Sequence, residues 1–266
     1  RVYVQADAVW VEDVGEVGEA TFQALRKFLL YGTKAKMENC GESWGLLLVS
    51  GPKSAEAVAA AFGIEVRALQ LLHTLPATIG GQQALILRTE ETGEQDFEVL
   101  LPADAVPAAW NQLMTSGAPF GIKPVGAQAR ELLRIEAGLP KAGPDLNEEI
   151  VPPEANLEGK AFSLSKGCYP GQEVVARMDT YGNVRRHLVG LIIQDKTVPP
   201  AGSKLFSGER EVGWVSSAVF SPQRNAALAF GFPLRDFSAP DTTLTVEVAG
   251  TRHQATVHAL PFQKHS

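Results

Sequence analysis

In the first half of the chain, segments with apolar residues at helical spacing alternate with short apolar runs. Residues 16–31 place their apolar side chains on one helical face and are followed by Gly32, so they are predicted to form an amphipathic helix. An opening β-hairpin is predicted before this helix. The other predicted elements are strands at residues 44–49, 84–88 and 97–101 and helices at residues 54–62, 103–114 and 124–137. Hairpins mixed with helices indicate an α+β domain with antiparallel sheet, not a parallel doubly wound one.

From about residue 186 the pattern changes to short strands separated by turns such as Ser207-Gly208 and Ala249-Gly250. The predicted strands are residues 188–193, 204–206, 211–215, 227–230, 243–248 and 251–258. A series of short strands with tight turns is typical of a small β-barrel. We therefore predict a first domain of residues 1–186 and a C-terminal barrel of residues 187–266.

The composition and net charge of the chain argue against some classes of binding partner. The 266 residues are 45% apolar, and 30 acidic against 24 basic side chains give a net charge of −6, so no general attraction to nucleic acid or to an anionic membrane is expected. No apolar run approaches the roughly 20 residues needed to span a bilayer. Cys40 and Cys168 are far apart, which argues against a disulfide scaffold or a four-cysteine metal site, and no metal site is predicted from the scattered histidines. A reducing, cytoplasmic compartment is expected.

Residues 166–173, with the sequence KGCYPGQE, concentrate candidate chemistry. Two glycines and a proline predict a tight loop that holds Cys168 in a fixed place. The neighbouring Lys166 would favour the thiolate of Cys168, which makes this thiol a candidate catalytic group. The alternative is a cysteine that packs as a small apolar residue. Glu173 could act as a base for the thiol or as a helix-capping group.

Three stretches resemble a known family. Residues 166–177 (KGCYPGQEVVAR) resemble the signature of the YgfZ-type folate-binding proteins, which are related to the glycine-cleavage T-protein. Residues 129–140 (ARELLRIEAGLP) resemble the segment of both families whose glutamate holds the pterin ring, and residues 211–217 resemble their shared C-terminal domain. The resemblance implies a T-protein-like folate-binding fold. Against the family pattern, a preceding segment of the folate-binding region, with an aspartate near the reacting folate nitrogen, is expected to be absent from this chain.

The same resemblance implies that Glu136 accepts hydrogen bonds from the pterin edge, although its spacing also allows an ion pair with Arg130 or Arg134. Folate ends in a glutamate tail, so cations are expected at the mouth of its site, unless they are ordinary solvated surface residues. The predicted folate-binding residues are Glu136, Lys166, Tyr169, Gly171, Gln172, Arg177 and Arg186, and the predicted catalytic residues are Cys168 and Glu173.

The resemblance implies a bacterial protein that binds tetrahydrofolate or a one-carbon derivative and acts in assembly or repair of iron-sulfur enzymes. Its partners would be folate and iron-sulfur client or assembly proteins. Two alternatives stay open: an aminomethyltransferase of a glycine-cleavage-like system, and a non-catalytic folate-binding scaffold. Residues 166–173 favour the first reading, because the T-protein does not characteristically carry this motif.

Overall fold

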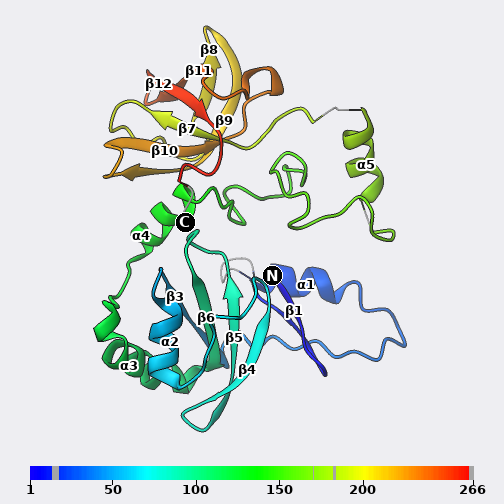
Figure 1. Cartoon of the computed structure of the whole chain (residues 1–266). Coiled ribbons are helices and arrows are strands. Elements are labelled where there is room, and N and C mark those ends of the chain that lie inside the picture. Colours follow the sequence, from blue (N-terminus) through cyan, green and yellow to red (C-terminus); the bar gives the residue numbers. More distant parts are fainter. Residues whose placement is uncertain (14–17, 170, 182–183, 264–266) are drawn as a thin grey trace. The chain divides into compact units, whose positions relative to one another are not determined.

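The computed structural model describes residues 1–13, 18–169, 171–181 and 184–263. The chain forms two compact units, Arg1–Val125 and Gly126–Ser266, which are described separately below (Figure 1). The second unit contains helices as well as the barrel strands. The predicted domain boundary near residue 187 stays a prediction. None of the helices in the described ranges has the length and apolar character needed to cross a membrane.

The first unit is built on a four-stranded antiparallel sheet with the strand order β3-β6-β5-β4. Its strands are β3 (Trp44–Ser50), β4 (Thr74–Ile79), β5 (Gln82–Thr89) and β6 (Asp96–Pro102). The predicted pairing of residues 84–88 with 97–101 is confirmed by the register of β5 and β6. The sequence pattern does not predict β4, which contains Pro76 and forms an edge of the sheet, where a missing backbone donor is tolerated.

Two helices cover one face of this sheet, α2 (Ser54–Phe62) and α3 (Val106–Ser116). Phe97, Val99 and Leu101 alternate along β6 and are buried in the core beneath these helices. The predicted helix at residues 103–114 is present, but it opens with a 3-10 turn, η1 (Ala103–Ala105), before α3 begins. A second 3-10 turn, η2 (Ala118–Phe120), follows α3.

The other face of the sheet packs against a two-stranded hairpin, β1 (Val2–Val4) and β2 (Val9–Val11). Tyr3 and Trp10 project from this hairpin onto leucines of β5 and β6, and together they form a second, smaller apolar cluster. Helix α1 (Gly18–Arg26) follows and buries none of its residues. The predicted helix at residues 16–31 is therefore too long at its C-terminal end, because Phe28, Leu30 and Tyr31 have no core to pack on and are exposed. Its first two residues lie outside the described ranges.

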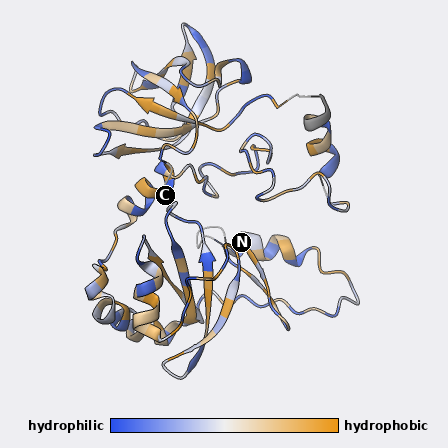
Figure 2. Ribbon diagram, viewed as in Figure 1, coloured by the Kyte–Doolittle hydropathy of each residue, from blue (hydrophilic) through white to orange (hydrophobic). Residues whose placement is uncertain are grey.

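The second unit contains the predicted barrel, which closes in the order β10-β7-β12-β11-β8-β9. Its strands are β7 (Val189–Ile193), β8 (Lys204–Ser207), β9 (Arg210–Ser221), β10 (Ala226–Gly231), β11 (Thr243–Val248) and β12 (Thr251–His258), with the 3-10 turn η3 (Arg235–Phe237) after β10. Figure 2 shows apolar residues recurring along these strands and those of the first sheet. Helix α4 (Ala127–Glu136) packs on β9 and β10 through the buried Ile135. The α+β fold with antiparallel sheets and a C-terminal barrel is confirmed.

Between α4 and the barrel the chain carries turns and one more helix, α5 (Gln172–Tyr181). Cys168 lies in the predicted loop, and Gly171 has the left-handed φ of +85° that its type allows. The loop prediction is wrong for the last two residues of the motif, because Gln172 and Glu173 form the first turn of α5. Glu173 is favourable there, since an acidic side chain complements the positive end of the helix dipole.

Candidate functional site

A buried carboxyl group lies at the centre of the first unit. Glu98 is on β6, directly opposite Leu87 of β5, and only 2% of its side chain is exposed. Arg1 donates to Glu98 Oε1 at 3.0 Å and to Glu12 Oε1 at 2.9 Å, and it also pairs with Glu91. The hydroxyl of Tyr3 donates to Glu12 Oε2 at 2.9 Å. One guanidinium therefore contacts three carboxyl groups. We call these residues together with Tyr3 the Glu98 cluster: Arg1, Tyr3, Glu12, Glu91 and Glu98.

Burial raises the pKa of Glu98 to about 7, with a further increase from the negative charge of Glu12, while Arg1 acts in the opposite direction. Burial likewise raises the pKa of Tyr3. The second oxygen of Glu98, Oε2, is buried and has no hydrogen-bond partner among the described residues. An unpaired buried carboxyl oxygen is costly, so this oxygen is a position where a ligand N–H group would be stabilising.

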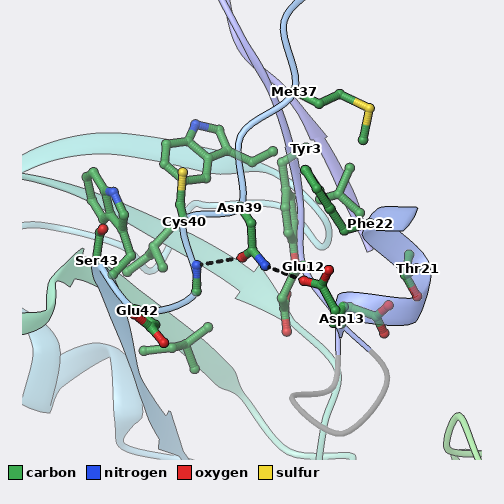
Figure 3. Close-up of a pocket in the computed structure, with 18 of the residues that line it drawn as sticks. Tyr3, Glu12, Asp13, Thr21, Phe22, Met37, Asn39, Cys40, Glu42 and Ser43 are labelled. Carbon is green, nitrogen blue, oxygen red and sulfur yellow. Dashed lines mark hydrogen bonds between the residues drawn. The ribbon is translucent and has the colours of Figure 1, made fainter. Parts of the chain in front are cut away.

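Beside the cluster is a cavity of about 780 Å³, shown in Figure 3. Its walls are aromatic, with Trp10 and Trp44 in edge contact at 5.1 Å between ring centroids, and leucines of the sheet also line it. The residues that line it include Tyr3, Trp10, Glu12, Asp13, Glu19, Phe22, Asn39, Glu42, Trp44, Leu87 and Leu100. The cavity is thus apolar and aromatic in its walls, with several carboxylates around it.

Glu98 projects on the cavity side of the sheet. Side chains two residues apart on a strand share a face, and so do direct cross-strand partners. Leu100, two residues along β6, and Leu87, the partner of Glu98, both line the cavity. Within the Glu98 cluster, Tyr3 and Glu12 line it as well. The cluster and the cavity are therefore one candidate site.

Sequence reasoning does not single out Glu98 or Tyr3. The available signal is an acidic residue in the middle of a predicted strand, where its neighbours Phe97 and Val99 are apolar. In a sheet covered on both faces such a residue is buried, and a buried carboxyl group needs a partner or a function. That the second face is covered becomes visible only when the hairpin is placed on the sheet.

The second unit holds the site residues predicted from sequence. Glu136, at the end of α4, is 5% exposed, and its Oε1 accepts a 2.9 Å hydrogen bond from the hydroxyl of Ser221 on β9. The alternative pair of Glu136 with Arg134 is wrong, because Arg134 instead binds Glu131 and Asp145. Ser221 supplies one of the donors that a buried carboxylate requires. The predicted ligand role of Glu136 stays a prediction.

The loop around Cys168 brings several predicted residues together. The thiol of Cys168 is exposed. Lys166 Nζ lies 4.9 Å from the centre of the Tyr169 ring, and the Tyr169 amide donates to Gln172 Oε1 at 3.3 Å. The Tyr169 hydroxyl is buried and has no hydrogen-bond partner in the described part of the chain. The loop is therefore held by contacts among its own residues, which leave the thiol accessible.

The predicted cations have their own partners in this unit. Arg177 pairs with Glu173 one turn earlier on α5, and both side chains are exposed. The guanidinium of Arg186 lies 4.7 Å from the Trp214 ring centre in the barrel. Glu173 is thus engaged as an ion-pair partner on the helix. Across the described ranges, no group of three or more His, Cys, Asp or Glu residues is arranged to hold a metal ion.

Comparison with known proteins agrees with this fold. Residues 3–164 match the GCVT N-terminal domain, and residues 186–264 match the glycine cleavage T-protein C-terminal barrel domain. An aminomethyltransferase of Saccharopolyspora erythraea is 33% identical over 87% of this chain and 63% of its own length. An aminomethyltransferase of Geobacillus sp. (strain WCH70) is 30% identical over 99% of this chain and 72% of its own length.

Among solved structures, the glycine cleavage system aminomethyltransferase T from Bartonella henselae superposes with a TM-score of 0.78 at 26% identity. The match covers 93% of this chain and 66% of that protein. The chain thus spans roughly two thirds of the length of these relatives, which contain further residues beyond the matched region. The two domain matches together cover most residues of this chain. The chain belongs to the family of the glycine cleavage T-protein, with a GCVT N-terminal domain followed by the T-protein C-terminal barrel domain.

Proposed function

We propose that the chain binds tetrahydrofolate, or a one-carbon derivative of it, and acts as a YgfZ-type protein in the assembly or repair of iron-sulfur enzymes. Two features support the proposal: the site around Glu98 and the exposed thiol of Cys168 in the motif of residues 166–173. Tetrahydrofolate would supply a carrier for a one-carbon unit. The residues of this chain would bind and orient it, and Cys168 would act in a separate step.

The observation that carries the folate proposal is the unpartnered oxygen of Glu98 beside an aromatic cavity. The amino-pyrimidinone edge of a pterin presents adjacent N–H donors, which match a carboxyl group, and its flat ring matches aromatic walls. The cavity volume of about 780 Å³ is in the range of small-molecule sites, about 300–1,000 Å³. The residues present therefore fit a pterin, with Glu98 as the group that would orient it.

Calorimetric titration of tetrahydrofolate into the wild-type chain tests this proposal. We expect binding to the wild type and a loss of about 10- to 100-fold in affinity for Glu98→Gln. The substitution replaces one carboxyl oxygen, which would accept a hydrogen bond from the pterin, by an NH2 group that can only donate. Asp104→Asn, at an exposed carboxylate outside the cavity, is the matched control and should bind like the wild type.

Glu136→Gln belongs in the same series, since the resemblance assigns the pterin to Glu136. Full affinity in Glu98→Gln with a large loss in Glu136→Gln would move the proposed pterin site to the second unit. No binding by the folded wild type would overturn the folate proposal as a whole.

The proposed role of the thiol has its own test. We expect Cys168→Ser to bind tetrahydrofolate like the wild type but to fail to rescue the activity of an iron-sulfur enzyme in bacteria that lack the wild-type protein. A hydroxyl has the shape of the thiol without its nucleophilicity. Full rescue by Cys168→Ser would rule the thiol out of the function.

A second candidate function is aminomethyl transfer, which is favoured by the relatives of Saccharopolyspora erythraea and Geobacillus, since both are aminomethyltransferases. The distinguishing measurement is transfer of a one-carbon unit from an aminomethylated lipoyl carrier protein to tetrahydrofolate. Turnover by Cys168→Ser as fast as by the wild type would favour the aminomethyltransferase, because that reading gives the thiol no role.

A further inference from the structure

The charged residues that line the cavity of the first unit are all acidic. Four carboxylates line it, and none of its described lining residues is a lysine, an arginine or a histidine. These four are Glu12, Asp13, Glu19 and Glu42. Arg1, which is not a lining residue, pairs with Glu12 and offsets its charge, so Asp13, Glu19 and Glu42 carry the argument. Glu98 projects from the same side of the sheet, and its buried Oε2 has no hydrogen-bond partner among the residues that the structure describes. Carboxylates that line one cavity produce a negative potential inside it, which attracts cations and repels anions.

The walls between these carboxylates are electron-rich rings. Trp10 and Trp44 meet with an interplanar angle of 71°, so their ring planes differ in direction, and Tyr3 and Phe22 add further rings. The face of an indole attracts a cation more strongly than that of any other side chain. A corner of indole rings beside carboxylates is the arrangement that binds organic ammonium groups, whose charge is spread over apolar C–H surface.

Hydrogen bonds hold this part of the site in place. Asn39 Nδ2 donates to Glu19 Oε2 at 3.0 Å, and Asn39 Oδ1 accepts from the Gly41 amide at 3.1 Å, as drawn in Figure 3. These contacts connect helix α1 to the segment that carries Glu42 and leads into β3. Glu19 and Glu42 are therefore presented to the cavity by linked segments.

We propose that the part of this cavity around Trp10 and Trp44 binds a compact organic ammonium ion, such as a methylated or primary alkylamine. A bare metal ion fits less well, because it needs several oxygen ligands where this corner offers rings. An anionic group, including the glutamate tail of a folate, is disfavoured here by the four carboxylates. The inference goes beyond the proposed function and does not depend on folate binding.

The test uses choline and its uncharged isostere 3,3-dimethylbutan-1-ol, titrated into the full chain without folate. The readout is the indole N–H signals of the four tryptophans in ¹H–¹⁵N spectra. Trp10 and Trp44 line the cavity, whereas Trp110 and Trp214 do not and act as internal controls. We expect choline to shift the first two signals and to bind about tenfold more tightly than the isostere.

Two variants sharpen the result. Trp44→Leu keeps an apolar wall but removes the ring, and it should weaken choline binding severalfold while leaving binding of the isostere nearly unchanged. Glu42→Gln should also weaken choline binding, and Asp104→Asn, outside the cavity, should not. Equal affinities for choline and the isostere, or no shift of either cavity indole, would overturn the inference. Tetrahydrofolate titrated in a separate sample reports on the proposed function alone, so the two failures are distinguishable.

Discussion

Replacing Asp145 by alanine is expected to lower the free energy of unfolding of the second unit by about 3–5 kcal/mol. Asp145 is fully buried, and its Oδ2 accepts from Arg134 Nη1 at 2.8 Å and from the Lys141 amide at 3.0 Å. Its other oxygen accepts from the hydroxyls of Ser216 and Ser217 at 2.6 and 2.7 Å. Without Asp145, the guanidinium of Arg134 loses one of its two carboxylate partners, and two buried hydroxyls lose their acceptor.

The effect is large because Arg134 is largely shielded from water, which can replace the lost carboxylate only poorly. Its side chain is 8% exposed and lies over the Phe230 ring of the barrel. Urea unfolding of the whole chain, followed by hydrogen exchange of barrel peptides, measures the change. Asp236→Ala, at an exposed carboxylate in η3, is the control and should stay within about 0.5 kcal/mol of the wild type. A loss below about 1 kcal/mol in Asp145→Ala would show that the network contributes little.

Glu98→Gln is expected to change the pH dependence of stability in the first unit. The pKa of Glu98 is raised from 4.5 to about 7, so the native state holds a proton that the unfolded state releases. The contribution of Glu98 to stability is therefore full below pH 4.5 and is lost as the pH rises through 7. A shift of that size corresponds to about 3 kcal/mol, since one pKa unit is about 1.4 kcal/mol. Glutamine stays neutral throughout.

The expected result is a free energy of unfolding for Glu98→Gln that rises relative to the wild type by about 3 kcal/mol between pH 4.5 and pH 8. Urea titrations at both pH values, read by hydrogen exchange of peptides from β5 and β6, measure this difference. Asp104→Asn serves as the control and should follow the wild type at both pH values, because its carboxylate is exposed. A difference between Glu98→Gln and the wild type that does not vary with pH would contradict the assigned protonation of Glu98.

The elements predicted best from the sequence are those that local residues determine. Strands β11 and β12 have their predicted bounds, because both alternate in burial and a tight turn at Ala249-Gly250 joins them. Helix α2 also begins and ends as predicted, with Gly63 in the left-handed conformation as its C-cap. By contrast, the sequence pattern does not predict α5, because the loop-like glycines and proline of residues 167–171 directly precede it, although α5 itself contains good helix formers.

The candidate site was harder to predict because it depends on pairing between distant segments. Glu98 becomes buried only through the register of β5 with β6 and through a hairpin near the start of the described chain, which carries Tyr3 and is followed directly by Glu12. Nothing in the sequence near residue 98 specifies that contact. The motif of residues 166–173, in contrast, is local and could be recognised directly, and its cysteine lies in a loop as predicted.

The most direct test of the central claim is a crystal structure of the chain with tetrahydrofolate. We predict the N–H edge of the pterin at hydrogen-bond distance, about 2.7–3.2 Å, from the carboxyl group of Glu98, with the ring against the aromatic walls of the cavity beside it. A pterin bound by Glu136 or elsewhere in the second unit, with no ligand atom near Glu98, would contradict the account.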